Sequence, residues 1–218
     1  MEYYLDSLSL LILISSFVLV ANKRINSYIK TFRLQSFLLV ILAGVIGVEK
    51  FLTEGALDII VVCVIILALK VIYIPRLLKN TVNKVEYKVE KDFFLNIPIG
   101  VLICCALVML VYYSISSVVP MNSGHSQVYL VNSISVVLIG LFFMISRKKA
   151  IGQIIGFLVL ENGLFTTAML TANGMPVIIE LGMFIDLLTA VMIMGVLVFK
   201  INENFESIDI NKLRNLRG

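Results

Sequence analysis

The feature that most constrains this chain is a succession of apolar runs, each close in length to a membrane-spanning helix. A helix needs roughly 20 mostly apolar residues to cross a bilayer. The runs that meet or approach this length are about 5–21, 35–49, 56–74, 97–117, 127–146, 150–171 and 176–199. The chain is 60% hydrophobic, whereas soluble domains are about 45–50% apolar. We therefore expect an all-α, polytopic membrane protein of about seven transmembrane helices.

The charges between these runs alternate from one connection to the next. Lysine and arginine gather in the connections 22–34, 75–96 and 147–149 and after residue 200, whereas 118–126 and 172–175 contain neither. Because basic connections stay in the cytoplasm, this bias predicts an outside N-terminus and a cytoplasmic C-terminus in the cell membrane. The same loops account for the net charge of +4, so that charge does not indicate nucleic-acid binding.

The apolar runs and the charged stretches divide the chain into three parts. Residues 1–126 carry four helices and a charged cytoplasmic connection at 75–96, either a solvated loop or a short surface helix, which begins at Pro75, a residue that ends helices. Residues 127–199 carry the last three helices. Residues 200–218 form a polar tail with too little apolar area to fold alone.

The chain offers no recognisable site for a metal or a cofactor. Its cysteines, Cys63, Cys104 and Cys105, lie inside apolar runs without a C-x-x-C spacing, and its single histidine, His125, lies in a loop. Neither a Walker loop nor a G-x-G-x-x-G motif is present. These patterns exclude intrinsic redox chemistry and nucleotide hydrolysis, so we expect no cofactor and no catalysis by this chain alone.

Three carboxylic acids stand inside the last two apolar runs. Glu161 and Asp186 lie near the midpoints of their runs, and Glu180 lies about 9 Å nearer the outside than Asp186. A charge at mid-depth costs about 2.5–3.5 kcal/mol, so such residues are normally kept for a function. Glu161 faces apolar side chains without an obvious cationic partner, which favours its protonated form. With Gln153, which could support a water chain two turns away, these acids form a predicted proton path.

Two further polar features of the runs have structural explanations. Gly152, Gly156 and Gly163 follow one stripe, and the G-x-x-x-G spacing of the first two lets another helix approach closely. Lys70 lies about one turn from the cytoplasmic end of its run, where its long stem is expected to reach the membrane interface.

The last two runs also resemble a known family. They carry the motifs LENG at 160–163, GMP at 174–176 and ELG at 180–182, followed by Asp186. Together, residues 151–199 resemble the E-type membrane subunit of group 4 nickel–iron hydrogenases, such as hydrogenase-4 and formate hydrogenlyase-like complexes.

Residues 127–218 are also similar to the K subunit of respiratory complex I. The shared features are a basic cluster after the first of three helices, a carboxylate in each of the next two, and a tail of the form SID…LRG that ends at Gly218. Asp186 stands about where that subunit has its second carboxylate. Leu158 stands where the first is found, with Glu161 one turn later.

The resemblance implies a place in a membrane arm. The expected partners are antiporter-like membrane subunits and, indirectly, soluble hydrogenase and iron–sulfur subunits, in a lipid bilayer. The intramembrane carboxylates would belong to the path of protons or Na⁺, while the redox chemistry occurs in other subunits.

Three functions remain open from the sequence. The first is a non-redox subunit of a membrane-bound hydrogenase or complex I-like oxidoreductase that contributes to ion translocation. The second is a subunit of a multisubunit cation/proton antiporter, which has no redox partner. The third is a purely structural membrane subunit, in which neutral carboxylic acids only hydrogen-bond helices together and the glycine stripe supports assembly.

Overall fold

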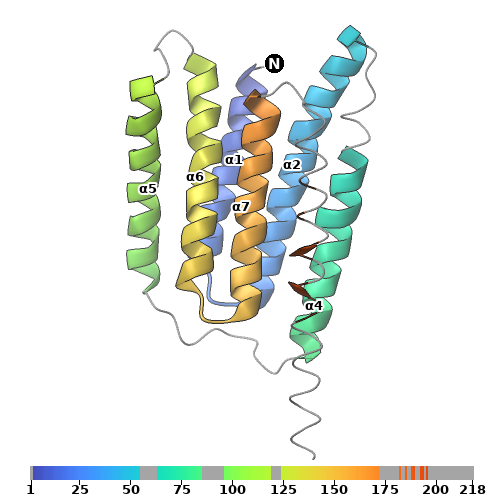
Figure 1. Ribbon diagram of the computed structural model, residues 1–218, viewed down its shortest axis with the longest axis vertical. Helices are drawn as coiled ribbons and strands as arrows, with labels where there is room; N and C mark the ends of the chain where they lie inside the picture. Colours follow the sequence, from blue (N-terminus) through green and yellow to red (C-terminus); the bar gives the residue numbers. More distant parts are fainter. Residues whose placement is uncertain are drawn as a thin grey trace, which may run out of the picture.

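The chain folds into a bundle of long, roughly parallel and antiparallel helices (Figure 1). The computed structural model describes residues 2–54, 63–84, 96–118 and 124–171, and single positions between 182 and 195. The long helices are α1 (Glu2–Val20), α2 (Ile25–Glu54), α5 (Ile97–Val118), α6 (Gly124–Ser146) and α7 (Ala150–Thr171). A π-helical segment, η1 (Leu67–Tyr73), continues directly into α4 (Ile74–Lys84).

Five of the described helices are long and apolar enough to cross a membrane. Their apolar spans are Tyr3–Val20, Ile25–Thr53, Ile97–Ser117, Gln127–Ser146 and Ala150–Thr171. The expected class, an all-α multi-pass membrane protein, is therefore confirmed for the described part of the chain. The count of about seven stays a prediction, because the runs 56–74 and 176–199 lie partly or largely outside the described residues.

The first predicted connection is wrong over most of its length. The sequence predicts a loop over 22–34, but α2 begins at Ile25, so only a short turn separates it from α1. Ile25, Tyr28 and Phe32 are almost completely buried. Their spacing of three and four residues places them on one helical face. This buried apolar face stabilises helix over the segment, although charged residues occupy its other faces.

The predicted stop at Pro75 is also wrong. Pro75 is the second residue of α4, a position where the fixed backbone angle of proline suits a helix. The π-helical segment ends just before it, where the Ile74 N–H donates to the Leu69 carbonyl. Helix α4 continues because it is amphipathic: Leu78 and Val82 are buried on one face of it.

The centre of the bundle is an antiparallel hairpin of α6 and α7. Helix α1 packs on α6 and α2, α5 packs on α6, and α2 packs on α7, η1 and α4. Helices α5 and α4 therefore lie at opposite edges of the bundle, as Figure 1 shows. Asn132 Nδ2 of α6 donates to Ser9 Oγ of α1 at 2.9 Å, which adds a polar contact between these two apolar helices.

Glycines set the distance between α6 and α7. A methyl group on Gly156 would lie 2.6 Å from the Met144 backbone nitrogen, and one on Gly163 would lie 2.7 Å from that of Val137. Gly140 of α6 makes the reciprocal approach, 2.5 Å from the Leu160 nitrogen. Gly152 is buried in the same helix. The backbones touch at glycine on both sides, which is how small residues pack helices in membranes.

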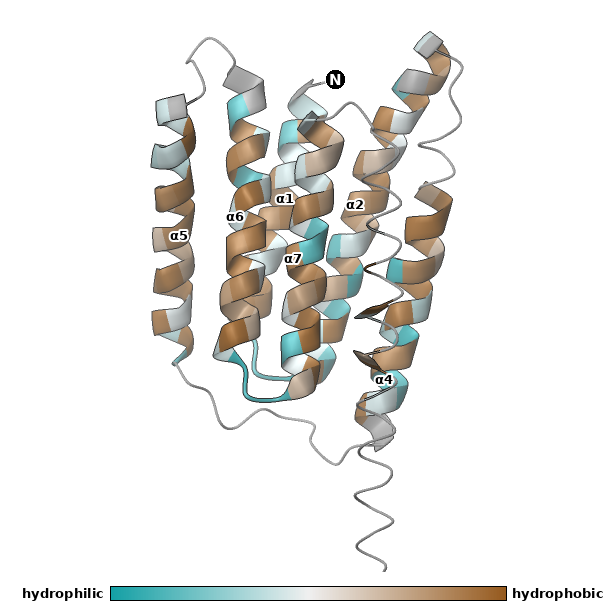
Figure 2. Cartoon of the chain, in the orientation of Figure 1, coloured by the Kyte–Doolittle hydropathy of each residue, from teal (hydrophilic) through white to brown (hydrophobic). Residues whose placement is uncertain are grey.

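The turns 21–24 and 147–149 meet at one end of the bundle, the lower end in Figure 2, where hydrophilic residues gather. Arg147 is buried there, although it belongs to the basic connection 147–149. Its guanidinium carbon lies 4.1 Å from the centre of the Phe143 ring and 5.1 Å from that of Tyr28. Arg147 Nη2 also donates to the Val20 carbonyl at 3.4 Å, so Arg147 joins the turn 147–149 to the last residue of α1.

Candidate functional site

Glu161 lies at the middle of α7 and forms a buried ion pair with Lys70 of η1. Lys70 Nζ is 2.9 Å from Glu161 Oε1, and the two side chains are only 1% and 3% exposed. Two expectations from the sequence are therefore wrong. Lys70 does not reach the membrane interface, and Glu161 does have a cationic partner. The reason is packing: η1 lies against α2, which packs on α7, so the lysine stem points inward.

The π-helical form of η1 accompanies this placement of Lys70. Lys70 is the central residue of Leu67–Tyr73, and it is buried together with Val71. A π turn changes the direction of the side chains that follow it, and such turns are frequent at functional sites. The Lys70 ammonium also lies 5.6 Å from the centre of the Phe165 ring of α7, where the π face favours a cation.

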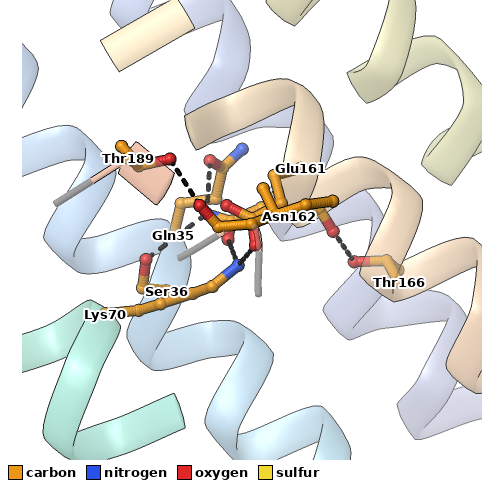
Figure 3. A network of polar contacts seen from close by, with 8 residues as sticks. Gln35, Ser36, Lys70, Glu161, Asn162, Thr166 and Thr189 are labelled. Atoms are coloured by element: carbon orange, nitrogen blue, oxygen red, sulfur yellow. Dashed lines mark hydrogen bonds and ion pairs between the residues drawn. The ribbon is translucent and has the colours of Figure 1, made fainter. Parts of the chain in front are cut away.

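A chain of hydrogen bonds extends from the ion pair to α2 and α1. Lys70 Nζ donates to Asn162 Oδ1 at 3.2 Å. Asn162 Nδ2 donates to Gln35 Oε1 at 3.2 Å and to Ser36 Oγ at 3.3 Å. Gln35 Nε2 then donates to Ser16 Oγ at 2.9 Å. Figure 3 shows the side chains of Lys70, Gln35 and Ser36 converging on the Glu161–Asn162 step of α7.

Four elements therefore contribute to one buried polar network: α1, α2, η1 and α7. We call its members Ser16, Gln35, Ser36, Lys70, Glu161 and Asn162 the buried polar network. All six are at most 3% exposed. Burying two charges is costly even when they are paired, and an apolar substitute of the same volume is often at least as stable. Stability alone is thus a weak explanation for an acid, a base and polar hydrogen-bond partners at mid-depth.

Chemically, the buried polar network places a carboxyl group, which can bind a proton, beside a lysine ammonium at 2.9 Å. The Asn162 amide oxygen offers the Lys70 ammonium a second acceptor at 3.2 Å. Among the described residues, no group of three or more His, Cys, Asp and Glu side chains could hold a metal ion.

The other predicted site residues fall in different places. Gln153 is exposed near the start of α7, and its Nε2 donates to the Arg147 carbonyl at 3.0 Å, so it does not join the buried polar network. Asp186 and Glu180 lie outside the described residues. Two described residues are close to them in sequence: a methyl group on Gly182 would lie 3.3 Å from the Phe165 ring, and Thr189 is buried.

Sequence reasoning missed most of the buried polar network. Gln35 and Ser36 open the second apolar run, and Asn162 follows Glu161 directly, but periodicity within one helix does not reveal partners on other helices. The available signal was charge: Lys70 and Glu161 are opposite charges inside two apolar runs, and buried charges are usually paired.

Comparison with known proteins finds several relatives, of which three are described. The chain is 35% identical over 159 residues to the uncharacterized protein Rv0085 of Mycobacterium tuberculosis, covering 72% of each chain. It is 25% identical over 150 residues to hydrogenase-4 component E of Escherichia coli K12, covering 68% of this chain and 69% of that protein. Component E of Shigella flexneri matches to the same extent. No family model and no solved structure matches.

Proposed function

We propose that this chain, which belongs to the same family as the mycobacterial protein Rv0085, is a membrane-arm subunit of a hydrogenase-type, complex I-like oxidoreductase, in which it helps to translocate protons or Na⁺. Its similarity to hydrogenase-4 component E supports the complex, and its apolar helices support the membrane location. In this proposal the chain itself carries no redox centre. The redox chemistry belongs to partner subunits.

The single observation that carries the proposal is the buried ion pair of Lys70 and Glu161. It lies about 16 Å along α7 from the start of that helix at Ala150, close to half of a hydrocarbon core of about 30 Å. An ionisable residue at this depth is by default a functional one. Its connection to α2 through Asn162 provides a way for the state of the pair to affect neighbouring helices.

The proposed step moves one proton through Glu161. In the resting state the Glu161 carboxylate forms an ion pair with the Lys70 ammonium, 2.9 Å away. When a proton binds to Glu161, the ion pair is lost, and the Lys70 ammonium is retained by Asn162 Oδ1 and the Phe165 ring. Release of the proton from the Glu161 carboxylic acid to the next acceptor restores the pair and returns the site to its starting charge.

We propose Asp186 as that next acceptor and Glu180 as part of the outer half of the path. The spacing along a helix places Asp186 on the same face as Gly182, Thr189 and Ile193, and these three described residues are buried. Gln153, exposed near the first turn of α7, would lie at the water-facing entrance. In the same proposal, residues 127–218 correspond to the K subunit of complex I.

The end of the bundle that holds the turns 21–24 and 147–149 is proposed to face the cytoplasm, with the N-terminus outside. The basic residues of both turns support this orientation. The membrane partners would be antiporter-like subunits of the same complex, with the soluble hydrogenase and iron–sulfur subunits attached indirectly.

The test is to replace the acids in the intact complex, reconstituted in vesicles. Glu161→Gln and Asp186→Asn should each abolish proton uptake that is coupled to turnover but spare electron transfer to an artificial acceptor. The exposed acid of α2, Glu49, provides the matched control, and Glu49→Gln should leave both activities unchanged. Normal pumping in both of the first two variants would sink the proposal.

Purification of the complex separates the remaining alternatives. A nickel–iron or iron–sulfur protein that copurifies with this chain supports the oxidoreductase subunit, and its absence favours a cation/proton antiporter. The glycine contacts between α6 and α7 favour a structural role as the second candidate. That role predicts failed assembly of the Gly156→Ala variant, with acid variants that pump normally.

A further inference from the structure

A basic cleft of about 680 Å³ lies between the first turns of α2 and the η1–α4 segment. Its charged wall consists of Lys30 and Arg33 from α2 and of Arg76 and Lys79 from α4, and its apolar wall includes Ile29 and Val71. We refer to it as the α2–α4 cleft. Its volume falls within the range of ordinary small-ligand sites, which are about 300–1,000 Å³.

The four cations of the α2–α4 cleft are exposed and concentrated on one site. Within the described ranges, none of them forms a salt bridge with a carboxylate; the ion pair described there is Lys70–Glu161. Like charges that line one cleft repel one another, and such a concentration attracts an anion. Arginine in particular binds phosphate oxygens through two parallel N–H donors.

The depth of the α2–α4 cleft indicates which anion it meets. On α2, Lys30 and Arg33 lie in the turns between Gln35 of the buried polar network and the basic end of the bundle, and side chains tilt toward the start of their helix, so these long side chains can extend toward the headgroups at that end. On the other wall, Lys79 lies about 13 Å further along the helix than the mid-depth residue Lys70, and half of the hydrocarbon core is about 15 Å. Both walls therefore carry their cations between the buried polar network and the basic end of the bundle, from where long basic side chains can reach lipid phosphates.

We propose that the α2–α4 cleft binds the phosphate group of an anionic phospholipid. The headgroup phosphate lies between the arginines and lysines, and the acyl chains follow the apolar wall toward the bilayer centre. A free phosphate ion would use the cations alone, whereas the cleft combines them with apolar surface that only a lipid covers. Basic pockets between transmembrane helices bind lipid headgroups in this way. This inference is independent of proton translocation.

The test measures lipid retention by the full-length chain purified in a mild detergent. Native mass spectrometry would compare phosphatidylglycerol with phosphatidylcholine, and inorganic phosphate would be added as a competitor. We expect phosphatidylglycerol to be retained preferentially, and Arg33→Gln/Arg76→Gln to weaken its binding by about tenfold or more. Arg33→Lys/Arg76→Lys, which keeps the charges, should give a smaller loss because the two-donor geometry is gone.

The matched control removes the same charge from the same end of the bundle. Arg24 and Lys148 are exposed there and do not line the cleft. Arg24→Gln/Lys148→Gln should retain phosphatidylglycerol as the wild type does. Equal losses in the control and cleft variants would overturn the proposal, since the attraction would then be general. So would unchanged binding in the cleft variant, or displacement of the lipid by millimolar inorganic phosphate, which would identify a soluble anion as the ligand.

Discussion

Lys70 Nζ of η1 lies 2.9 Å from Glu161 Oε1 of α7, and neither side chain is more than 3% exposed. This contact joins two elements that are far apart in sequence, and Asn162 extends it to α2. A buried pair of this kind has a characteristic energetic signature. Removing one partner leaves the other charged and buried, whereas removing both leaves only a change in packing.

That signature gives the first prediction. Lys70→Met should lower the free energy of unfolding by about 3–5 kcal/mol, because Glu161 then loses its cation. Lys70→Met/Glu161→Met should recover much of this loss. The free energies of unfolding of both variants can be measured on the purified protein in detergent. The helical circular-dichroism signal reports the unfolding, because the chain has no Trp whose fluorescence could be followed. The exposed Lys148→Met should have little effect, and an equally unstable double variant would contradict a coupled pair.

The second prediction concerns Asn162, which connects the pair to α2. Asn162→Ala removes the donor to Gln35 and Ser36 and the acceptor for Lys70, and it leaves those partners buried. We expect a loss of about 1–3 kcal/mol in the free energy of unfolding. Asn80→Ala makes the same chemical change at an exposed position of α4 and should cost much less. Similar melting temperatures for the two variants would show that the Asn162 contacts contribute little.

The third prediction uses two glycines that differ only in their surroundings. Gly156→Ala would place a methyl group 2.6 Å from the Met144 backbone nitrogen, so α6 and α7 must separate, at a cost of about 1–3 kcal/mol. Gly44 of α2 has no atom within 4 Å of the same position, so Gly44→Ala should stabilise its helix by up to about 1 kcal/mol. Thermal unfolding of the two variants should therefore shift in opposite directions. A shift of Gly156→Ala upward would show that the hairpin is not closely packed.

The glycine contacts also show how far the sequence predicts the fold. The apolar runs identify α1, α5, α6 and α7 to within a few residues at most ends, because length and hydropathy are properties of a single segment. The stripe of Gly152, Gly156 and Gly163 indicates a packing face, but not its partner. The packing role of Gly140 can be recognised only when α6 and α7 are placed side by side in their register. Periodicity within one helix does not reveal that register.

The candidate site was predictable in part for the same reason. An acid at mid-depth identifies Glu161 without any structure, since a charge inside an apolar run is costly enough to mark the residue whatever its partner is. Identifying Lys70 as its partner requires knowing which helices are neighbours. The rule that long basic side chains reach the interface gives the wrong prediction for Lys70, because this lysine pairs with a carboxylate inside the bundle. Asp186 and Glu180 remain predictions.

The last prediction concerns Arg147, which has the charge of a loop residue and the burial of a core residue. Its guanidinium stacks on Phe143 and donates to the Val20 carbonyl, so it joins the turn 147–149 to the end of α1. Arg147→Lys keeps the positive charge that biases orientation but loses the planar group that stacks. We expect it to lower the free energy of unfolding by about 1–3 kcal/mol without changing the orientation of the termini. Thermal unfolding tests the loss of stability, and mapping which side of the membrane each terminus is accessible from tests the orientation. The control is Lys148→Arg, at an exposed position. Unchanged stability of Arg147→Lys would mean that charge alone matters at this position.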